Sequence, residues 1–297
     1  MSLSKKWGRF AVTGATLSFC LCAGAAEAQE YQSDTSIAYR YGTRFTEPNV
    51  NNGDDIERSI LNINHFGVDK WGSNFIDIDL LFSANEDPVF GNESQGATEV
   101  YAVLRRDWRF SKITGIKVSN WLIRDYALHM GADFNTKNNA FAPEKRSFVI
   151  GPKIDFNVPV GYFNIAFDYF KEWNHNGIVN NPAFGNIPGQ SNVEFDPAFE
   201  IEAAWAFPFE VSGLALTFRG FLTYVGPKGK DGFGNETKAE ILARPELMLD
   251  VGNFWGAKNR FEIGVGYEYW YNKFGNDHRT NEGAIANTPE FIARMHF

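Results

Sequence analysis

The sequence predicts an all-β protein: a transmembrane, antiparallel up-and-down β-barrel of about twelve strands, preceded by a cleaved signal peptide. Three observations support this prediction. The stretch 195–207 alternates strictly between mostly apolar odd positions and small or acidic even positions, which is the period of an extended strand. Similar stretches recur along the chain, and several have the roughly 9–11 residues that a tilted strand needs to cross a bilayer. The connections between them alternate between long and short, as in bacterial outer-membrane barrels.

Residues 1–28 are predicted to be a secretory signal peptide. A basic start precedes an apolar run at 10–22 and a small-x-small cleavage pattern at 26–28. The barrel domain is therefore expected to span 29–297. Both cysteines, Cys20 and Cys22, lie in the removed segment. We expect neither a disulfide nor a thiolate metal site in the mature protein.

Charge and hydropathy limit the possible partners. The full chain has a formal net charge of −8, and removing 1–28, which holds three bases and one acid, brings it to about −10. An acidic protein binds nucleic-acid polymers poorly, so none is expected as a partner. After the signal peptide no apolar run reaches the roughly 18 residues of a membrane helix. The 28 phenylalanines suit contact with outer-membrane lipid.

Twelve segments share the alternating pattern, and turns rich in Gly, Asn, Asp and Pro separate them. In chain order they are 34–45, 56–68, 75–82, 98–110, 116–130, 147–157, 162–174, 195–207, 214–225, 238–251, 260–272 and 290–297. The count is even, as expected for a closed bacterial barrel.

The first four strands indicate which face meets lipid. In the first strand the apolar odd positions, including Phe45, are expected to face outward, with Arg44 inward. The second strand is less regular, and its facing stays open. The third strand carries Asp77 and Asp79 inward, where carboxylates need water or partners. The fourth strand presents a ladder of charges to the interior.

The fifth strand is the least regular of the middle set. Its alternation is disturbed near Arg124, where we expect a bulge, and a long polar loop is expected at 131–146. The sixth and seventh strands are regular, with aromatic and aliphatic side chains outward and polar ones inward.

The last five strands repeat the pattern. The eighth is 195–207, with Glu200 and Glu202 inward, and the ninth to eleventh alternate in the same way. The twelfth ends at Phe297, and a terminal aromatic in this pattern resembles the sorting signal of outer-membrane barrels.

Loop lengths and prolines add two further expectations. Long connections are expected near residues 47, 85, 131, 175, 226 and 273, and short ones near 69, 111, 158, 208 and 252. With long loops outside, both chain ends fall on the periplasmic side. Proline cannot donate to a β-ladder, so Pro152, Pro197 and Pro245 are expected at bulges or strand ends.

Four short stretches match a known family, in order along most of the mature chain. They are 42–45 before an Asn-rich loop, 109–114, 151–155 and 173–177. With them the chain resembles the nucleoside-specific outer-membrane channels, the Tsx-type porins. The resemblance implies a monomeric twelve-stranded barrel in the bacterial outer membrane, without a cofactor, whose narrow lumen passes nucleosides by diffusion. The chain departs from the family at Glu200 and Glu202, where the family carries basic inward residues.

Inward charged and aromatic side chains are the candidate solute-binding residues of the lumen. They are Arg40, Arg44, Asp77, Asp79, Tyr101, Arg105, Asp107, Phe170, Glu200, Glu202, Phe221, Arg244, Glu246 and Trp270. Aromatic rings can stack on a base, and charged groups can hydrogen-bond sugar hydroxyls. The solute could equally be another small polar molecule. The alternative for each residue is that opposed acids and bases only brace the wall.

Two other classes of function remain open. A phospholipase-like barrel enzyme needs a Ser–His pair with an orienting third group, but the five histidines form no motif and no Gly-x-Ser-x-Gly occurs. The sequence contains no His-x-x-x-His pair, which would indicate a metal site. The acidic loop 85–96 is better interpreted as exposed to solvent than as a site for a divalent ion. A barrel could also serve as an anchor or adhesin. In any of these classes the long loops are candidate attachment points for phage or toxins.

Overall fold

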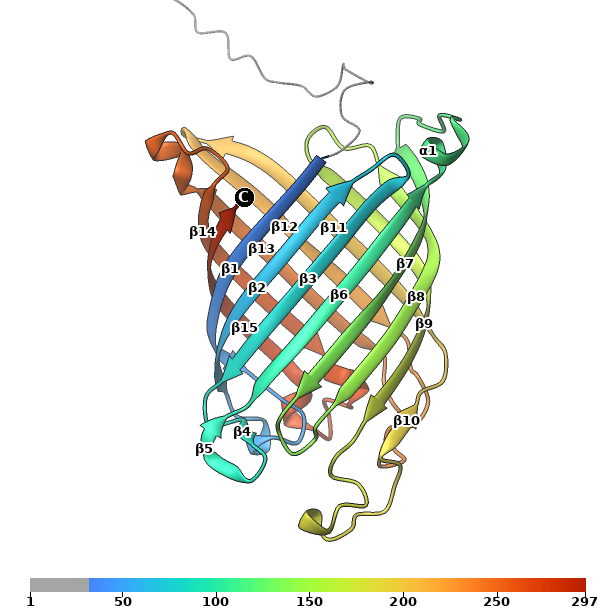
Figure 1. Cartoon of the computed structure of the whole chain (residues 1–297), viewed down its shortest axis with the longest axis vertical. Coiled ribbons are helices and arrows are strands. Elements are labelled where there is room, and N and C mark those ends of the chain that lie inside the picture. The colour runs from blue at the N-terminus through green and yellow to red at the C-terminus, as the bar shows by residue number, and fades with distance from the viewer. Residues whose placement is uncertain (1–31) are drawn as a thin grey trace, which may run out of the picture. The chain divides into compact units, whose positions relative to one another are not determined.

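The computed structural model describes residues 32–297, so the expected signal peptide lies outside the described residues. The described chain forms a closed antiparallel barrel of twelve strands (Figure 1). Each barrel strand pairs with the next one along the chain, and the last pairs with the first. The predicted fold class is confirmed.

The barrel strands are β1 (Gln32–Phe45), β2 (Ile56–Val68), β3 (Gly72–Ser83), β6 (Thr98–Arg109), β7 (Ile123–Lys137), β8 (Glu144–Phe156), β9 (Tyr162–His175), β11 (Ala198–Val211), β12 (Leu214–Val225), β13 (Glu240–Asp250), β14 (Phe261–Tyr271) and β15 (Ile285–His296). In the long loops, β4 (Pro88–Val89) pairs with β5 (Asn92–Gly96), and β10 (Asn192–Glu194) extends the edge of β9.

Helices are few and short in the described part of the chain. The single α-helix is α1 (Phe110–Thr114), and the 3-10 turns are Asn51–Gly53, Pro182–Phe184, Val251–Trp255, Lys273–Gly275 and Glu282–Ala284. None of these helices is long and apolar enough to span a bilayer.

The outer face of the barrel is apolar and the inner face is charged. Exposed large side chains that the alternation predicted to face outward are Ile37, Tyr39, Ile76, Phe82, Leu104, Trp108, Phe148, Tyr169, Trp173, Phe199, Phe218, Leu247, Phe261, Ile263, Val265, Tyr267, Phe291 and Met295. In β2, whose facing was open, Leu61 and Ile63 point outward. A closed barrel of this kind satisfies its backbone internally and presents hydrocarbon to lipid, so it is a barrel of the bacterial outer membrane.

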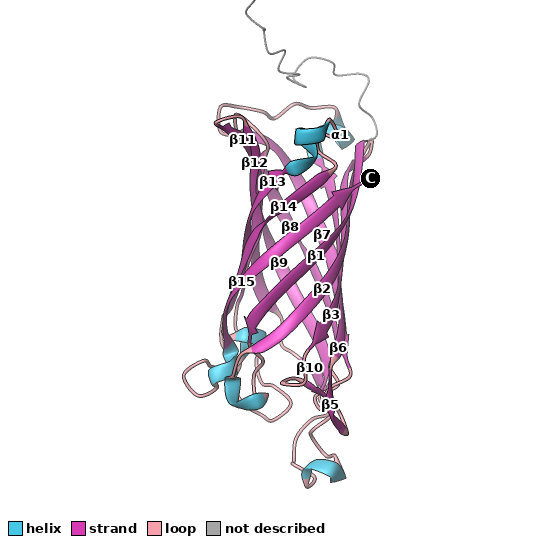
Figure 2. Ribbon diagram, turned by 90° about the vertical axis from the view of Figure 1, so that its left-hand side faces the viewer, coloured by secondary structure: helices cyan, strands magenta, loops and turns pink. Residues whose placement is uncertain are grey.

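The two ends of the barrel differ (Figures 1 and 2). At the loop end the connections are 46–55, 84–97, 138–143, 176–197, 226–239 and 272–284. At the turn end, which also holds the start of β1 and the C-terminus (Figure 1), they are 69–71, 110–122, 157–161, 212–213 and 251–260. Long loops face the cell exterior in such barrels. The predicted alternation fails at three connections: 110–122 and 251–260 are long, because they contain α1 and the 3-10 turn Val251–Trp255, and 138–143 is short.

The fifth predicted strand was misplaced. β7 starts at Ile123 and continues to Lys137, so the expected strand 116–130 and the expected loop 131–146 are both wrong. The polar residues Asp133 and Asn135 are buried on the inner face of β7. A strand that lines a charged interior is as polar as a loop on every second residue, so polarity alone could not separate them. The irregularity predicted near Arg124 is present, as a register shift between β7 and β8.

The facing of the end of β1 was also wrong. The register between β1 and β2 shifts between Gly42 and Phe45, and such a bulge reverses the faces of the residues beyond it. Phe45 is therefore only 1% exposed and packs inside against Ile56 and Ile60. The side chain of Arg44 is 61% exposed and pairs outside with an equally exposed aspartate.

The three prolines, which cannot donate a backbone hydrogen bond to a neighbouring strand, are accommodated in two ways. Pro197 lies at the rim, just before β11, as expected. Pro152 and Pro245 lie where the ladders β8–β9 and β13–β14 are interrupted, at 150–153 and 243–246, and each ladder resumes in the same register. The expected bulges at these two prolines are therefore wrong, and the missing donor is met by a local gap in pairing.

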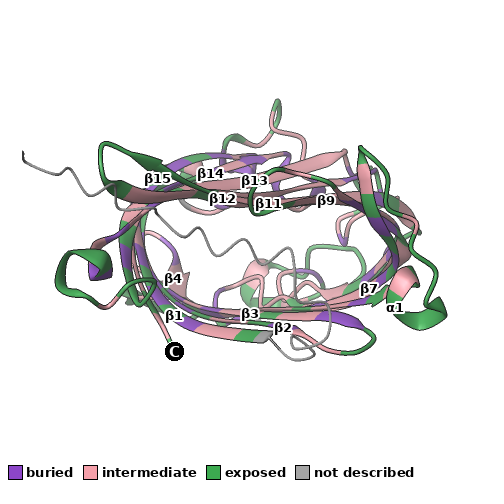
Figure 3. Ribbon diagram, turned by 90° about the horizontal axis from the view of Figure 1, so that it is seen from above, coloured by how far each residue is buried: buried purple, intermediate pink, exposed green. Residues whose placement is uncertain are grey.

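Seen along its axis, the barrel is flattened (Figure 3). One long wall contains β12, β13 and β14, and the facing wall contains β1, β2 and β3 (Figure 3). Flattening brings inner side chains of the two long walls within reach of each other, which determines the chemistry of the interior.

Candidate functional site

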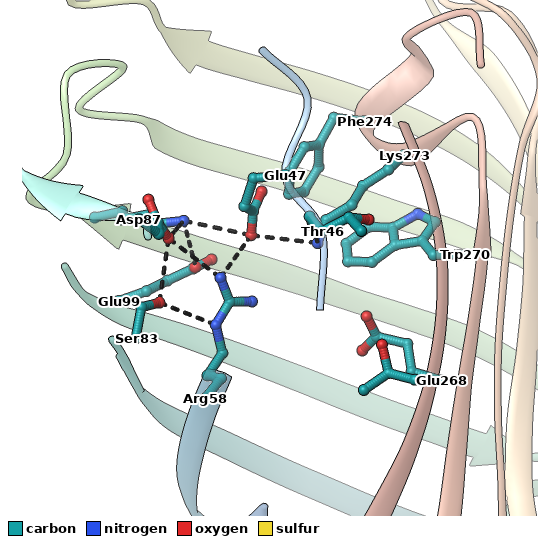
Figure 4. Close-up of polar contacts among 12 residues, drawn as sticks. Thr46, Glu47, Arg58, Ser83, Asp87, Glu99, Glu268, Trp270, Lys273 and Phe274 are labelled. Carbon is teal, nitrogen blue, oxygen red and sulfur yellow. Dashed lines mark hydrogen bonds and ion pairs between the residues drawn. The ribbon is translucent and has the colours of Figure 1, made fainter. Parts of the chain in front are cut away.

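Five charged side chains form a network at the loop end, here called the mouth cluster (Figure 4). Glu47 lies 2.9 Å from Arg58, 3.2 Å from Lys273 and 3.3 Å from Lys137. Asp87 lies 2.6 Å from Lys137 and 3.2 Å from Arg58. All five side chains are at most 6% exposed. Because three of them come from loops and two from strands, the cluster ties the loops to the barrel wall.

The charge of the mouth cluster centres on Glu47. Burial alone would raise the pKa of this carboxyl, but Lys137, Lys273 and Arg58 outweigh burial and hold the pKa well below its usual range. Each of the three cations makes a charge-assisted contact with the carboxylate of Glu47, so these contacts fix its position.

Lys273 also lies over two aromatic rings. Its ammonium lies 4.5 Å from the ring centre of Trp270 and 5.4 Å from that of Phe274, within the range of cation–π attraction. It donates a hydrogen bond to the carbonyl oxygen of Thr46 at 2.9 Å. The indole N–H of Trp270 donates to Glu240 at 2.6 Å. Trp270 therefore faces the interior, as its alternation predicted, with a lysine on its face.

Below the mouth, aromatic rings and lysines alternate in a row that we call the cation–aromatic stack. Lys145 lies 5.3 Å from the ring centre of Tyr101 and 5.9 Å from that of Phe170. Lys228 lies 5.8 Å from Phe170 and 4.6 Å from Phe195. The sequence predicted Tyr101 and Phe170 as lumen residues. It missed both lysines, because Lys145 stood in a predicted loop and Lys228 comes from a true loop that folds inward.

Ion pairs also join the two long walls. Asp79 of β3 binds Arg40 of β1 and lies 3.3 Å from Arg244 of β13, on the facing wall. Arg244 in turn binds Glu268 at 2.5 Å and lies 6.0 Å from the ring centre of Phe221. These contacts unite predicted lumen residues that are far apart in the sequence.

A second ion pair joins strands that are not neighbours in the barrel. Arg105 of β6 donates to Glu202 of β11 at 2.9 Å and to Asp133 of β7 at 2.6 Å. On β3, Asp77 accepts hydrogen bonds from Asn62 at 2.8 Å and from a neighbouring asparagine. The carboxylates of this level therefore differ in their partners, some with arginine and some with amides.

At the turn end another set of ion pairs fills the interior. Glu246 lies 3.1 Å from Arg219 and 3.0 Å from Arg294. Glu262 binds Arg219 and lies 3.1 Å from His296. Charged layers thus occur at both ends and in the middle of the lumen.

All the predicted lumen residues except Arg44 have side chains on the inner face. Other inner charges, among them Lys137, Lys145, Lys228, Glu268 and Lys273, were not among the candidates. Two of them, Lys228 and Lys273, lie in loops, and no periodic signal marks a loop residue that turns inward.

One hydroxyl–imidazole pair occurs in the described residues. Thr35 and His65 form a hydroxyl–imidazole hydrogen bond of 2.8 Å between β1 and β2, but no carboxylate within residues 32–297 hydrogen-bonds His65. An orienting third group is needed to make such a pair a nucleophile and base. In the same part of the chain, no cluster of three or more His, Cys, Asp or Glu side chains has the geometry to hold a metal ion.

Comparisons with known proteins agree with the architecture only in outline. No family model matches the sequence, and no curated protein matches it. Among solved structures, the chain is similar to the KdgM porin (9% identity, covering 88% of this chain and 99% of that one, TM-score 0.41) and to a NanC porin (9%, 89% and 99%, TM-score 0.45). It is also similar to the translocator domain of the autotransporter NalP from Neisseria meningitidis (11%, 89% and 88%, TM-score 0.44). At these scores the likeness carries no argument about function. The chain is a twelve-stranded outer-membrane β-barrel, with a lumen of layered charges and aromatic rings.

Proposed function

We propose that the protein is a channel through which small polar solutes, nucleosides among them, cross the outer membrane by passive diffusion. The cation–aromatic stack carries this proposal. It groups three rings with lysines against their faces, those of Tyr101 and Phe170 on the barrel wall and that of Phe195 in the loop 176–197. A row of separate aromatic faces can bind a flat nucleoside base weakly and in sequence.

The energetics of the stack favour passage over retention. A base that stacks on Phe170 gains about 1–3 kcal/mol, and it displaces a lysine whose cation–π contact is worth about 0.5–2 kcal/mol. The exchange is nearly balanced, so the bound state is shallow. Displaced Lys145 keeps a carboxylate neighbour in Asp133, 4.0 Å away. A channel needs sites that bind well enough to admit a solute and weakly enough to release it.

Carboxylates beside the stack support the binding of the sugar. Asp133 lies 3.4 Å from the hydroxyl of Tyr101, and Glu172 holds the ammonium of Lys228. Carboxylates accept hydrogen bonds from hydroxyl groups strongly. A nucleoside offers a flat base at one end and hydroxyl donors at the other, which matches rings and acids at one level of the lumen.

Planar-bilayer recording tests the proposal. Purified protein should give small single-channel conductances that adenosine or thymidine partly blocks, while ribose, which lacks a base, blocks less. A conductance that nucleosides leave unchanged would restrict the channel to other solutes, which a liposome-swelling panel of sugars and amino acids would identify. An absence of conductance would refute the channel and favour the anchor, adhesin or enzyme classes.

A further inference from the structure

The connections at the two ends of the barrel carry opposite charge. The five turn-end connections contain five Lys or Arg and one Asp, whereas the six loop-end connections contain five Lys or Arg and twelve Asp or Glu. The formal net charge of the chain is −8, so the positive turn end runs against the overall composition. A surface of one sign attracts ligands of the other, so the turn end favours an anionic partner.

The cations of the turn end are not engaged by acids of the chain itself. The single acid there, Asp69, lies 2.8 Å from Arg106 and accepts a hydrogen bond from the backbone N–H of Trp71 at 2.8 Å. Within residues 32–297, no Lys or Arg of the turn-end connections forms an ion pair. Lys112 donates to the carbonyl oxygen of Asp69 at 3.1 Å, and Arg260 donates to that of His296 at 3.2 Å. Their charges are therefore available to an external anion.

Large apolar side chains accompany these cations on the two longest turn-end connections. Trp121 is 87% exposed in 110–122, and Trp255 is 61% exposed in 251–260, next to the exposed Phe254. Single exposed apolar residues are common, but several on two short segments form a patch that indicates an interaction site. Tryptophan is enriched where a bilayer meets water, because its ring is apolar and its N–H is polar.

Both segments project sideways from the barrel. Seen along the axis, α1 lies outside the ring of strands (Figure 3), and in Figure 1 it projects at the upper right while Val251–Trp255 projects at the upper left. On the wall beside α1, Trp108 and Tyr126 are exposed on the lipid-facing side. The two segments therefore continue the lipid-facing surface beyond the strand ends, at the level of the lipid headgroups.

The combination of these features selects lipid as the partner. Exposed aromatic and aliphatic side chains next to lysines are typical of segments that lie in the interface of a bilayer. The periplasmic leaflet of an outer membrane consists of phospholipids, and an anionic phospholipid offers both a negative headgroup and acyl chains. A periplasmic protein could cover the same patch, but the continuity with the lipid-facing wall favours lipid.

We propose that 110–122 and 251–260, here called the turn-end collar, bind anionic phospholipids of the periplasmic leaflet. The exposed rings enter the interface, and the cations that contact the headgroups are Lys112, Lys117, Lys258 and Arg260. Each Lys or Arg near an anionic surface strengthens attachment about fivefold. The proposal depends on the location of the barrel in the outer membrane, and not on what passes through the lumen.

Binding is measured at Trp121, in the purified mature barrel in micelles of a neutral detergent. Tryptophans are labelled with fluorine, and the resonance of Trp121 is assigned by its loss in Trp121→Phe. Phosphatidylglycerol should move this resonance saturably, with an apparent affinity at least about fivefold higher than that of phosphatidylcholine with the same acyl chains. Added salt should reduce the difference, because it screens exposed charges.

Two outcomes of this titration would overturn the proposal. Equal affinity for the two lipids would show that the collar does not recognise an anionic headgroup. No movement of the Trp121 resonance with either lipid would show that the collar does not bind lipid, and would favour a periplasmic protein as its partner.

Matched variants locate the site. Lys112→Gln combined with Lys117→Gln should weaken the affinity for phosphatidylglycerol at least about fivefold and leave that for phosphatidylcholine unchanged. Lys230→Gln combined with Lys238→Gln removes the same charge from the loop end and should leave both affinities unchanged. Lys117→Gln alone replaces the first double variant if that variant does not fold. An unchanged affinity in the folded collar variant, or an equal loss in the loop-end variant, would refute the site.

Discussion

Replacing Phe170 with alanine is the sharpest test of the cation–aromatic stack. The ring lies between Lys145 and Lys228, 5.9 and 5.8 Å from their ammonium groups. A base on this ring gains about 1–3 kcal/mol by stacking, less about 0.5–2 kcal/mol for a displaced cation. At the middle of these ranges the net loss in Phe170→Ala is about 0.8 kcal/mol, which weakens nucleoside block about fourfold.

The assay is the concentration of adenosine that halves the single-channel current. Tyr169 is the matched control, because it is the neighbouring aromatic residue and is 49% exposed on the lipid face. Tyr169→Ala removes a similar ring without changing the lumen. Adenosine should therefore block this variant as it blocks the wild type. Unchanged block in Phe170→Ala, or an equal loss in Tyr169→Ala, would show that this ring does not bind the base.

Three further predictions concern the mouth, the bulge and the terminus. Glu47→Gln should loosen the mouth cluster and raise the conductance, whereas Glu57→Gln, which is exposed, should not. The pKa of Glu47 is lowered in the folded state, so the stability that Glu47 contributes is complete above the ordinary carboxyl value of about 4.3 and is lost only as pH falls toward the lowered folded pKa; wild-type conductance should therefore stay constant down to about pH 4, and a rise near that pH would show that the cluster does not hold Glu47 ionised. Phe45→Ala should lower the free energy of unfolding by about 3–5 kcal/mol and Arg44→Ala by no more than about 0.5 kcal/mol, measured by urea titration in micelles; the reverse order would contradict the bulge. Phe297 is 58% exposed, so its deletion should leave unfolding nearly unchanged while slowing insertion, followed by heat-modifiable mobility on gels, and normal insertion would show that it is no sorting signal.

Local patterns were enough to predict the strands, because each face of a membrane-spanning strand has one kind of neighbour. β2 and β12 begin and end at the predicted residues. The pattern failed where a bulge reversed it, at Phe45, and where a charged inner face imitated a loop, at 131–137. Neither failure has a local signature, since both depend on what the neighbouring strand presents.

The pairing of charged side chains inside the lumen could not be predicted from the sequence, for a different reason. The contact between Asp79 and Arg244 joins facing walls and depends on the cross-section of the barrel. The inward turn of Lys273 depends on the ring of Trp270 beneath it. Alternation predicts which side chains face inward, but the pairing of inner charges needs the register of all the strands together.

A closed ring of twelve strands has a perimeter set by strand number and tilt, but its area is free to vary and is largest for a circle. The contacts Asp79–Arg244 and Arg105–Glu202 hold this ring away from that limit. Each of these two ion pairs therefore limits the cross-sectional area of the barrel. Removing one lets the wall move outward while every backbone hydrogen bond stays intact. The size of the passage can then change between variants, or between salt concentrations, without any change in secondary structure.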